Sequence, residues 1–490
     1  MNRVKSSFSL WSLLSLALAV PVWIMVFRGS VLGREVDGGI FLSISDGLAN
    51  GLNRYTDLWD NKDPFFGAFM AGASHISPTL PFFMDLLWIP LAALGAYFIA
   101  RSVTSGDRAL FLGLVATPFL IVGPFYVAGW ANTPGTALVL LGWGLLAVRR
   151  WVLGGLVIGL LFFIKITVWP IALLGLLLFL VLGSEKRRGA VRALVAMGIM
   201  MAISFAVMLV LGWLPGYIDM IGQNQAYSKA VITYFGFEDS PFGHIEKLRT
   251  DWTGAIWFAV GLAVLVAVIG LVVSLLDRRR RAGELVASAY LIVALVGSSG
   301  ALAFTYLWPH HVQALSLPLI LAAILAGALI PSRVWFAPWV VLMIVVTFVL
   351  SAWGSVSTFT THYSTLADQF TNRQAAISFE PLDANLLNTV PLSEFTFARL
   401  GTNDDQGFLG SVREGATLGC PRFHDYDFSP VEAFTEQLKC IQGVDVILKT
   451  TNFDVFANGM NAANVQPILD FVNANFNCLI VNDRQLCTRK

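Results

Sequence analysis

The chain has 490 residues, of which 56% are hydrophobic and 13% are charged, and its mean hydropathy is +0.70. A composition this apolar excludes a string of ordinary soluble domains and places most of the chain in a lipid bilayer. The net charge is +1, and the basic residues gather in short turns between apolar spans, which excludes a nucleic-acid-binding surface and follows the positive-inside rule.

The first apolar segment, about residues 9–27, follows Arg3 and Lys5 and could be a signal peptide. It lacks a clean small-x-small cleavage site and runs directly into an acidic loop. We therefore expect a retained transmembrane helix that starts from a cytoplasmic N-terminus.

The loop that follows, residues 28–79, carries acidic residues among apolar positions that recur at helical spacing. Ile44 and Leu48 lie on one helical face, with Asn50-Gly51 as a stop, and Asp63-Pro64 predicts the N-cap and first turn of a second short helix. We expect both helices to lie along the membrane surface and the loop to form an ordered polar site on the external side.

An acidic residue soon after the first span, an amphipathic stretch ending near N-G and the run D-N-K-D-P-F at residues 60–65 mark this loop. Together they resemble the first external loop of the GT-C superfamily of membrane glycosyltransferases, in particular its protein O-mannosyltransferase and aminoarabinose transferase branch. The resemblance covers about residues 34–75. It implies that Asp37 is the catalytic base and that Lys62 meets the lipid phosphate of the donor.

Two positions of the loop depart from the family pattern. The family often has D-E where this chain has Asp37-Gly38, and P-P where it has Asp63-Pro64. The role of a second acid beside the base therefore stays open. Glu35 is the competing base, and Asp60 is a further candidate for the site.

Apolar spans of about 20 residues, with Lys and Arg on the cytoplasmic side, predict the path through the membrane. After the first helix, the expected spans are about residues 80–100, 109–123, the segment that returns to Arg149-Arg150, and about residues 151–164, 167–183, 193–213, 254–276, 285–305, 312–330 and 334–352. A total of about eleven spans is odd and places the C-terminal part outside. We expect a polytopic α-helical protein of the plasma (inner) membrane, with residues 1–352 as a GT-C-like transmembrane domain.

Three further parts of the external face are candidates for the site. Lys165, between two short spans, is either a snorkelling lysine or a substrate-binding one. The loop of residues 215–251, with apolar positions such as Ile218 and Ile221 at helical spacing, is either a surface-lying helix or a lid over the lipid donor. His310 and His311 lie at the outer mouth of a span, as interfacial residues or as groups near the donor phosphate.

The last part of the chain, residues 353–490, is more polar and holds 9 Lys and Arg against 15 Asp and Glu. A capping box at residues 429–432 opens a helix to about Cys440, and further strand and helix patterns follow. We expect a small extracytoplasmic α/β domain here. The pair Asp404-Asp405 is either a metal or nucleotide-sugar site or, as its sequence favours, an ordinary loop.

All four cysteines lie in this last part. An even count confined to one polar region favours disulfides in an oxidising compartment. A zinc site is the alternative, but the spacings lack the paired C-x-x-C ligands of a structural site. Because each pair flanks a short supersecondary unit, we expect the bridges Cys420–Cys440 and Cys478–Cys487.

No nucleotide-binding, metalloprotease or serine-hydrolase motif occurs in the chain. The resemblance therefore implies a polyprenyl-phosphate-linked sugar as donor, a lipid, glycan or protein hydroxyl as acceptor, and an inverting transfer with Asp37 as general base. No cofactor is expected, and a divalent metal stays open. A lipid or solute transporter or flippase and a non-catalytic membrane anchor are the alternatives, although no inverted repeat or mid-span cluster of acids supports a transporter.

Overall fold

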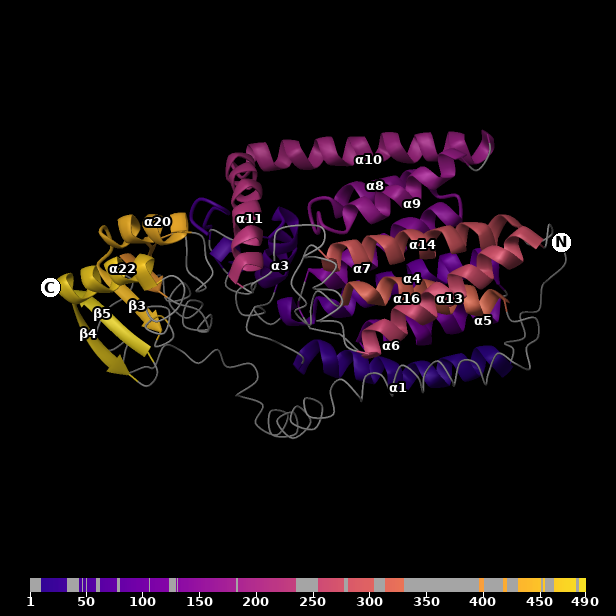
Figure 1. Cartoon of the computed structure of the whole chain (residues 1–490), viewed down its shortest axis with the longest axis horizontal. Coiled ribbons are helices and arrows are strands. Elements are labelled where there is room, and N and C mark those ends of the chain that lie inside the picture. Colours follow the sequence, from indigo (N-terminus) through magenta and orange to yellow (C-terminus); the bar gives the residue numbers. More distant parts are fainter. Residues whose placement is uncertain are drawn as a thin grey trace. The chain divides into compact units, whose positions relative to one another are not determined.

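The computed structural model describes most of the helical part and the sheet of the chain (Figure 1). The described residues are 10–32, 44–45, 47–49, 51–58, 62–76, 80–104, 106–122, 129, 131–181, 184–234, 254–276, 281–303, 313–329, 396–400, 417–420, 431–450, 453, 462–481 and 484–490. They belong to two compact units. The first comprises Met1–Arg34, Phe82–Ser204 and Ile245–Tyr363, and the second Glu35–Pro81, Phe205–His244 and Ser364–Lys490.

The first unit is a bundle of helices. Its elements are α1 (Leu10–Leu32), α4 (Asp85–Val103), α5 (Gly106–Phe111), the π-helical η2 (Leu112–Ala116), α6 (Thr117–Val122), α7 (Asn132–Ala147), α8 (Trp151–Leu161), α9 (Trp169–Val181), most of α10 (Ser184–Val210), α13 (Gly254–Leu276), α14 (Arg281–Ala303), η3 (Gln313–Leu315) and α16 (Ser316–Leu329). The short η1 (Leu80–Phe83) comes just before α4, and the division between the units falls within it. Helix α4 packs along α7, and α14 packs against α13 and α16. By length and composition, the described residues include three helices able to cross a membrane, at Asp85–Val103, Lys186–Val210 and Glu284–Ala301.

Aromatic packing ties three helices of this bundle together. The Trp143 ring of α7 stacks on Tyr290 of α14 with centroids 4.4 Å apart, and the Trp143 indole N–H donates to the Ala172 carbonyl of α9 at 3.0 Å. Gly175 of α9 lies where any Cβ would meet the Trp143 indole. The bundle therefore packs around a buried tryptophan whose one polar atom is satisfied, as burial in an apolar interior requires.

The helices follow the expected spans with three differences. Helix α13 has the expected bounds, whereas α1 continues to Leu32, five residues past the apolar run. The expected third span is a helical run that contains the π-helical segment η2. The basic stretch at residues 185–192, expected to lie between spans, forms the first turns of α10 instead, because Lys and Arg are good helix formers. The span at residues 334–352 lies outside the described residues, so the count of eleven stays a prediction.

The described C-terminal residues form one five-stranded sheet with the strand order β2-β1-β3-β5-β4. The strands are β1 (Thr396–Leu400), β2 (Thr417–Leu418), β3 (Val446–Thr450), β4 (Phe476–Val481) and β5 (Arg484–Arg489). Strand β1 runs parallel to β2 and β3, and β5 pairs antiparallel with both β3 and β4. The expected helix to about Cys440 is α20 (Val431–Ile441), and a second helix, α22 (Ala462–Asn475), precedes β4.

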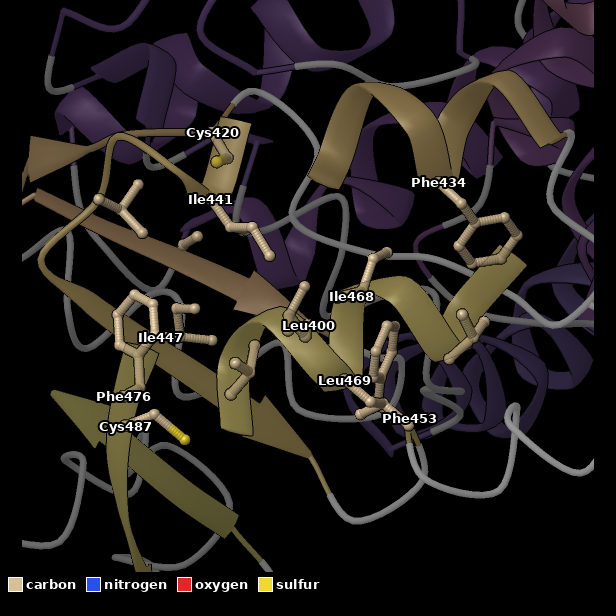
Figure 2. Packing of buried hydrophobic residues seen from close by; sticks show 14 residues of the cluster. Leu400, Cys420, Phe434, Ile441, Ile447, Phe453, Ile468, Leu469, Phe476 and Cys487 are labelled. Atoms are coloured by element: carbon tan, nitrogen blue, oxygen red, sulfur yellow. The ribbon is translucent and has the colours of Figure 1, made fainter. Parts of the chain in front are cut away.

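Both helices contribute to one apolar core against the sheet (Figure 2). Phe434 of α20 and Ile468 of α22 are buried together with Leu400 of β1 and Ile447 of β3. Burial does not alternate along these two strands: Phe397–Leu400 of β1 and Val446–Lys449 of β3 are all buried, so residues on both faces of the strands are covered. The extent of a separate domain over residues 353–490 stays a prediction, because residues 351–395 lie outside the described part.

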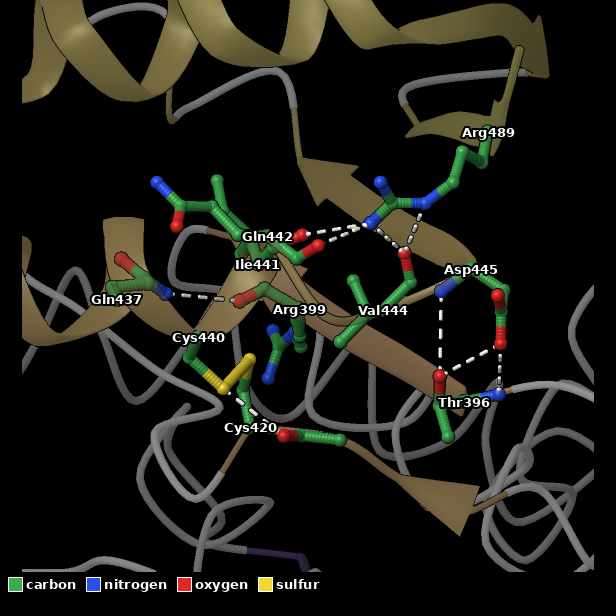
Figure 3. The surroundings of a disulfide bond; sticks show 11 residues. Thr396, Arg399, Cys420, Gln437, Cys440, Ile441, Gln442, Val444, Asp445 and Arg489 are labelled. Atoms are coloured by element: carbon green, nitrogen blue, oxygen red, sulfur yellow. Dashed lines mark hydrogen bonds between the residues drawn. A yellow bond between two sulfur atoms is a disulfide. The ribbon is translucent and has the colours of Figure 1, made fainter.

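Two disulfides join the cysteines in the pairs expected from the sequence. Cys420 is bonded to Cys440 with Cα atoms 5.7 Å apart (Figure 3), and Cys478 to Cys487 with Cα atoms 3.9 Å apart. Cys478 and Cys487 lie directly opposite each other on β4 and β5. The first bridge therefore links the chain after β2 to the end of α20, and the second closes the last hairpin.

Candidate functional site

Residues 51–58 of the second unit form a tight turn just before Lys62. The Tyr55 N–H donates to the Leu58 carbonyl at 2.8 Å, and the Asn53 N–H donates to Asp57 Oδ2 at 2.8 Å. Tyr55 has a φ of 70°, in the left-handed region that a residue with a side chain adopts only at a cost. This tight turn places the side chains of residues 54 and 55 beside the segment that leads into helix α3 (Pro64–Ile76).

Two side chains of this turn hold the main chain of Lys62. The Tyr55 hydroxyl donates to the Lys62 carbonyl at 2.8 Å, and Arg54 Nη2 donates to the same carbonyl at 3.1 Å and to the Asp63 carbonyl at 3.3 Å. Arg54 is only 1% exposed, and its guanidinium occupies the space that a Cβ on Gly67 of α3 would fill. Lys62 itself is half-buried. Its backbone is therefore held by hydrogen bonds from two buried residues.

Asp63 connects this loop to helix α11 (Leu214–Tyr234). The Asp63 side chain is buried, and Asp63 Oδ1 accepts a hydrogen bond from the Tyr217 hydroxyl at 3.3 Å. Burial and, after it, the negative charge of Asp63 raise the pKa of the Tyr217 hydroxyl well above its ordinary value. The phenol therefore remains protonated and keeps its role as donor.

The first turn of α11 lies directly on the Tyr55 turn. The Tyr55 and Tyr217 rings have centroids 6.0 Å apart, and a Cβ on Gly216 would lie 2.5 Å from Tyr55 Cβ. The Asn53 side-chain amide also donates to the Leu211 carbonyl at 3.3 Å, at the corner between α10 and α11. A glycine at 216 is therefore required for the loop and α11 to pack this closely.

Ile218 and Ile221, the apolar positions that the sequence pattern aligns on α11, are 62% and 37% exposed. Tyr217 and Met220 are buried instead, at 1% each. Both faces of this helix carry apolar residues, so periodicity identifies the helix but not the side that meets the loop.

Of the candidate residues from the sequence, Lys62 lies in this polar site and Lys165 lies in the other unit. Lys165 is half-buried in the break between α8 and α9, where its N–H donates to the Leu161 carbonyl at 2.9 Å and its Cγ would lie 3.2 Å from a Cβ on Gly135. The remaining candidates fall outside the described residues; they are Glu35, Asp37, Asp60, His310 and His311.

A buried polar pair lies close in sequence to the two histidines. Gln313, which is 1% exposed, donates from its side-chain amide to the Thr133 hydroxyl oxygen at 2.9 Å, in the first turn of α7.

Within the described ranges, no group of three or more His, Cys, Asp or Glu side chains is arranged to hold a metal ion.

Sequence reasoning missed Arg54, Tyr55 and Tyr217 as parts of the site. A buried arginine and two tyrosines beside a lysine and an acid have no local signature, since their partners lie up to 154 residues away in the chain. The one local signal is Asp63-Pro64, which predicts the start of α3, and α3 begins at Pro64.

Comparison with known proteins connects this fold to solved structures. No protein-family model matches the sequence, and no curated protein matches it either. The chain is similar to ArnT from Cupriavidus metallidurans bound to undecaprenyl phosphate, with a TM-score of 0.53 and 14% identity over 98% of this chain and 97% of that chain.

It is also similar to the Archaeoglobus fulgidus oligosaccharyltransferase, in complex with Zn and sulfate and in the apo form. Both comparisons have a TM-score of 0.50 and 13% identity, and they cover 90% and 92% of this chain and 68% and 71% of the other. At such identity the likeness establishes the fold. The chain shares its fold with these two proteins, as the resemblance at residues 34–75 implied.

Proposed function

We propose that this protein is a membrane glycosyltransferase that moves a sugar from a polyprenyl-phosphate-linked donor to an acceptor hydroxyl on the extracytoplasmic side of the membrane. The observation that carries the proposal is the likeness, over nearly the full length of both chains, to a structure of ArnT that holds undecaprenyl phosphate. The donor of this chain would accordingly be a lipid of the same chemical class.

Lys62 is the residue that we assign to the lipid phosphate. The ammonium of a lysine is a compact cation suited to a monophosphate, and a cation at this point stabilises the negative charge that develops on the leaving group. The hydrogen bonds from Arg54 and Tyr55 to the Lys62 carbonyl support this role, because they fix the main chain from which the lysine side chain extends. His310, His311 and Lys165 are further candidates for the phosphate side of the donor.

Asp37 is the residue that we assign as general base, on the strength of its place in the loop. The acceptor oxygen attacks the anomeric carbon and loses its proton to the Asp37 carboxylate. The bond between the anomeric carbon and the phosphate oxygen breaks, and the polyprenyl phosphate leaves with the electron pair. A single displacement of this kind inverts the anomeric configuration. Glu35 and Asp60 are the competing acids.

The reaction is tested with purified full-length protein and a set of polyprenyl-phosphate sugars. We expect release of free polyprenyl phosphate together with a glycosylated acceptor. Movement of the lipid between the leaflets of a vesicle without release of the phosphate would instead identify a flippase.

The base is tested by Asp37→Asn, which keeps the size of the side chain but cannot accept the proton. Transfer should fall by about 10² to 10⁴-fold, the usual contribution of a general base, while donor binding persists. Glu35→Gln is the matched control and should be far milder. Transfer by Asp37→Asn at the wild-type rate would reject this mechanism and direct the search to Glu35 or Asp60.

The phosphate ligand is tested by Lys62→Ala, which should weaken donor binding and slow turnover. Lys62→Arg should recover part of both, because the charge remains although its geometry differs. Lys439→Ala, on the exposed side of α20, is the control for loss of one positive charge. Unchanged donor affinity in Lys62→Ala would remove Lys62 from the site.

A further inference from the structure

Asp63, an acidic residue, directly follows Lys62, the residue proposed to bind the donor phosphate. A carboxylate exposed at Asp63 would repel the phosphate and compete for the lysine ammonium. In the structure the Asp63 side chain is 8% exposed, and one of its oxygens accepts a hydrogen bond from the Tyr217 hydroxyl at 3.3 Å. The carboxylate is therefore turned into the protein, toward α11.

Arg54 adds a positive charge to the same buried place. Its guanidinium donates to the Asp63 carbonyl at 3.3 Å and lies 5.0 Å from the centre of the Tyr55 ring. Arg54 and Tyr217 therefore both donate to Asp63, Arg54 to its main chain and Tyr217 to its side chain. A buried cation from the same loop thus lies at the Asp63 main chain, and a hydroxyl donor from the distant helix α11 binds its carboxylate.

We infer that Tyr217, together with Arg54, masks the charge of Asp63 and thereby sets the affinity of Lys62 for the lipid phosphate. Tyr217 is then a positioning residue for the donor, acting through Asp63. This inference rests on the proposed role of Lys62. It also gives the first turn of α11 a function, because a displacement of α11 would release an uncompensated carboxylate beside the phosphate.

The alternative is that the Tyr217–Asp63 hydrogen bond only holds the loop on α11. The two roles separate in a double-mutant cycle, because Asp63→Asn removes the charge while keeping a side chain of similar size that can accept a hydrogen bond from Tyr217. If Tyr217 masks a charge, its removal matters only while that charge is present. If it only holds the loop, its removal costs the same in both backgrounds.

The experiment measures binding of radiolabelled undecaprenyl phosphate to the purified full-length protein in detergent. Tyr217→Phe should bind about 10-fold more weakly, near the lower end of what one hydrogen bond to a charged group is worth. Asp63→Asn should bind at least as tightly as wild type, and adding Tyr217→Phe to it should cost less than about 3-fold, in line with a neutral hydrogen bond. The turnover number at saturating donor should change little, so the effect appears in affinity.

Tyr290→Phe is the matched control, since it removes the hydroxyl of another fully buried tyrosine, in the helical bundle, and should leave binding unchanged. An equal loss from Tyr217→Phe in the presence and absence of the Asp63 charge would overturn the inference, and so would wild-type binding by Tyr217→Phe when Lys62→Ala binds weakly. Unchanged binding by Lys62→Ala would overturn the assignment of Lys62 and the inference with it. These patterns differ, so the two failures are distinguishable.

Discussion

The helical bundle of the first unit and the C-terminal sheet are packed by different means. In the bundle, glycines bring helix backbones together. A Cβ on Gly95 of α4 would meet the backbone of α7 at Leu140 and Leu141, and a Cβ on Gly144 of α7 would meet the backbone of Gly95. In the C-terminal region, large apolar side chains such as Phe434 fill a core between two helices and the sheet.

The difference follows from the solvent of each region. Lipid tails are as apolar as a leucine side chain, so burial gives helices in a bilayer little reason to associate, and close contact between small residues supplies dispersion energy instead. In water, removal of apolar surface is the main driving force. A small region can bury only a limited core, and the two disulfides then add stability. The glycine contacts of the bundle thus agree with the membrane location that its apolar helices indicate.

The largest expected effect that sharpens this comparison is the loss of the Cys420–Cys440 bridge. Replacing both cysteines by serine should destabilise the C-terminal sheet by about 3 kcal/mol, and loss of the shorter Cys478–Cys487 loop should cost less. Hydrogen exchange of the full-length protein should show faster exchange in β1, β3 and α20, with α4 and α7 unchanged. Equal acceleration in the bundle would show that the two regions unfold together.

A smaller effect is expected from Gly95→Ala in the bundle. The added methyl group would force α4 away from the backbone of α7 and should cost about 1 to 3 kcal/mol, measured by thermal unfolding in detergent. Gly198→Ala in α10 is the matched control. An added Cβ there meets nothing within 4 Å, so it should be neutral or stabilise the helix by about 0.5 to 1 kcal/mol. The same loss from both variants would refute packing as the cause.

The smallest effect concerns the sheet at low pH. The Thr396 hydroxyl and N–H both donate to Asp445, at 2.8 and 3.1 Å, and these hydrogen bonds lower the pKa of that carboxyl (Figure 3). The folded-state pKa is below the unfolded one, so Asp445 contributes stability above the ordinary pKa of about 3.9, and that stability is lost as the pH falls through the lowered value.

Asp445→Asn should therefore make the loss of sheet stability below about pH 4 less steep, with little change in the bundle. Thr396→Val should reproduce part of this change, since it removes the hydroxyl donor but keeps the backbone one. The measurement is hydrogen exchange or proteolysis of the full-length protein between neutral and acid pH. An unaltered acid slope in Asp445→Asn would show that this carboxylate does not link the sheet to pH.

Local chemistry made the elements of both regions predictable. Hydropathy alone located α13, and Asp63-Pro64 marked the start of α3 at Pro64. Cysteines flanking a hairpin and a capped helix indicated the two bridges that the structure contains. These signals act between residues that are near in sequence, so they survive without knowledge of the fold.

The local run D-N-K-D-P-F indicates Lys62 as a candidate site residue. The same run does not indicate what the residues around Lys62 do. Which face of α11 meets the loop, and that Asp63 turns toward Tyr217 rather than toward solvent, depend on contacts between residues 154 positions apart. Likewise, glycines such as Gly95 and Gly144 within apolar segments predict close helix packing in a membrane. Only the fold shows that these two glycines meet each other. The sequence by itself determined the positions of most described helices and the pairing of the cysteines. The tertiary structure decided which groups surround Lys62, because burial and charge compensation are properties of the assembled chain.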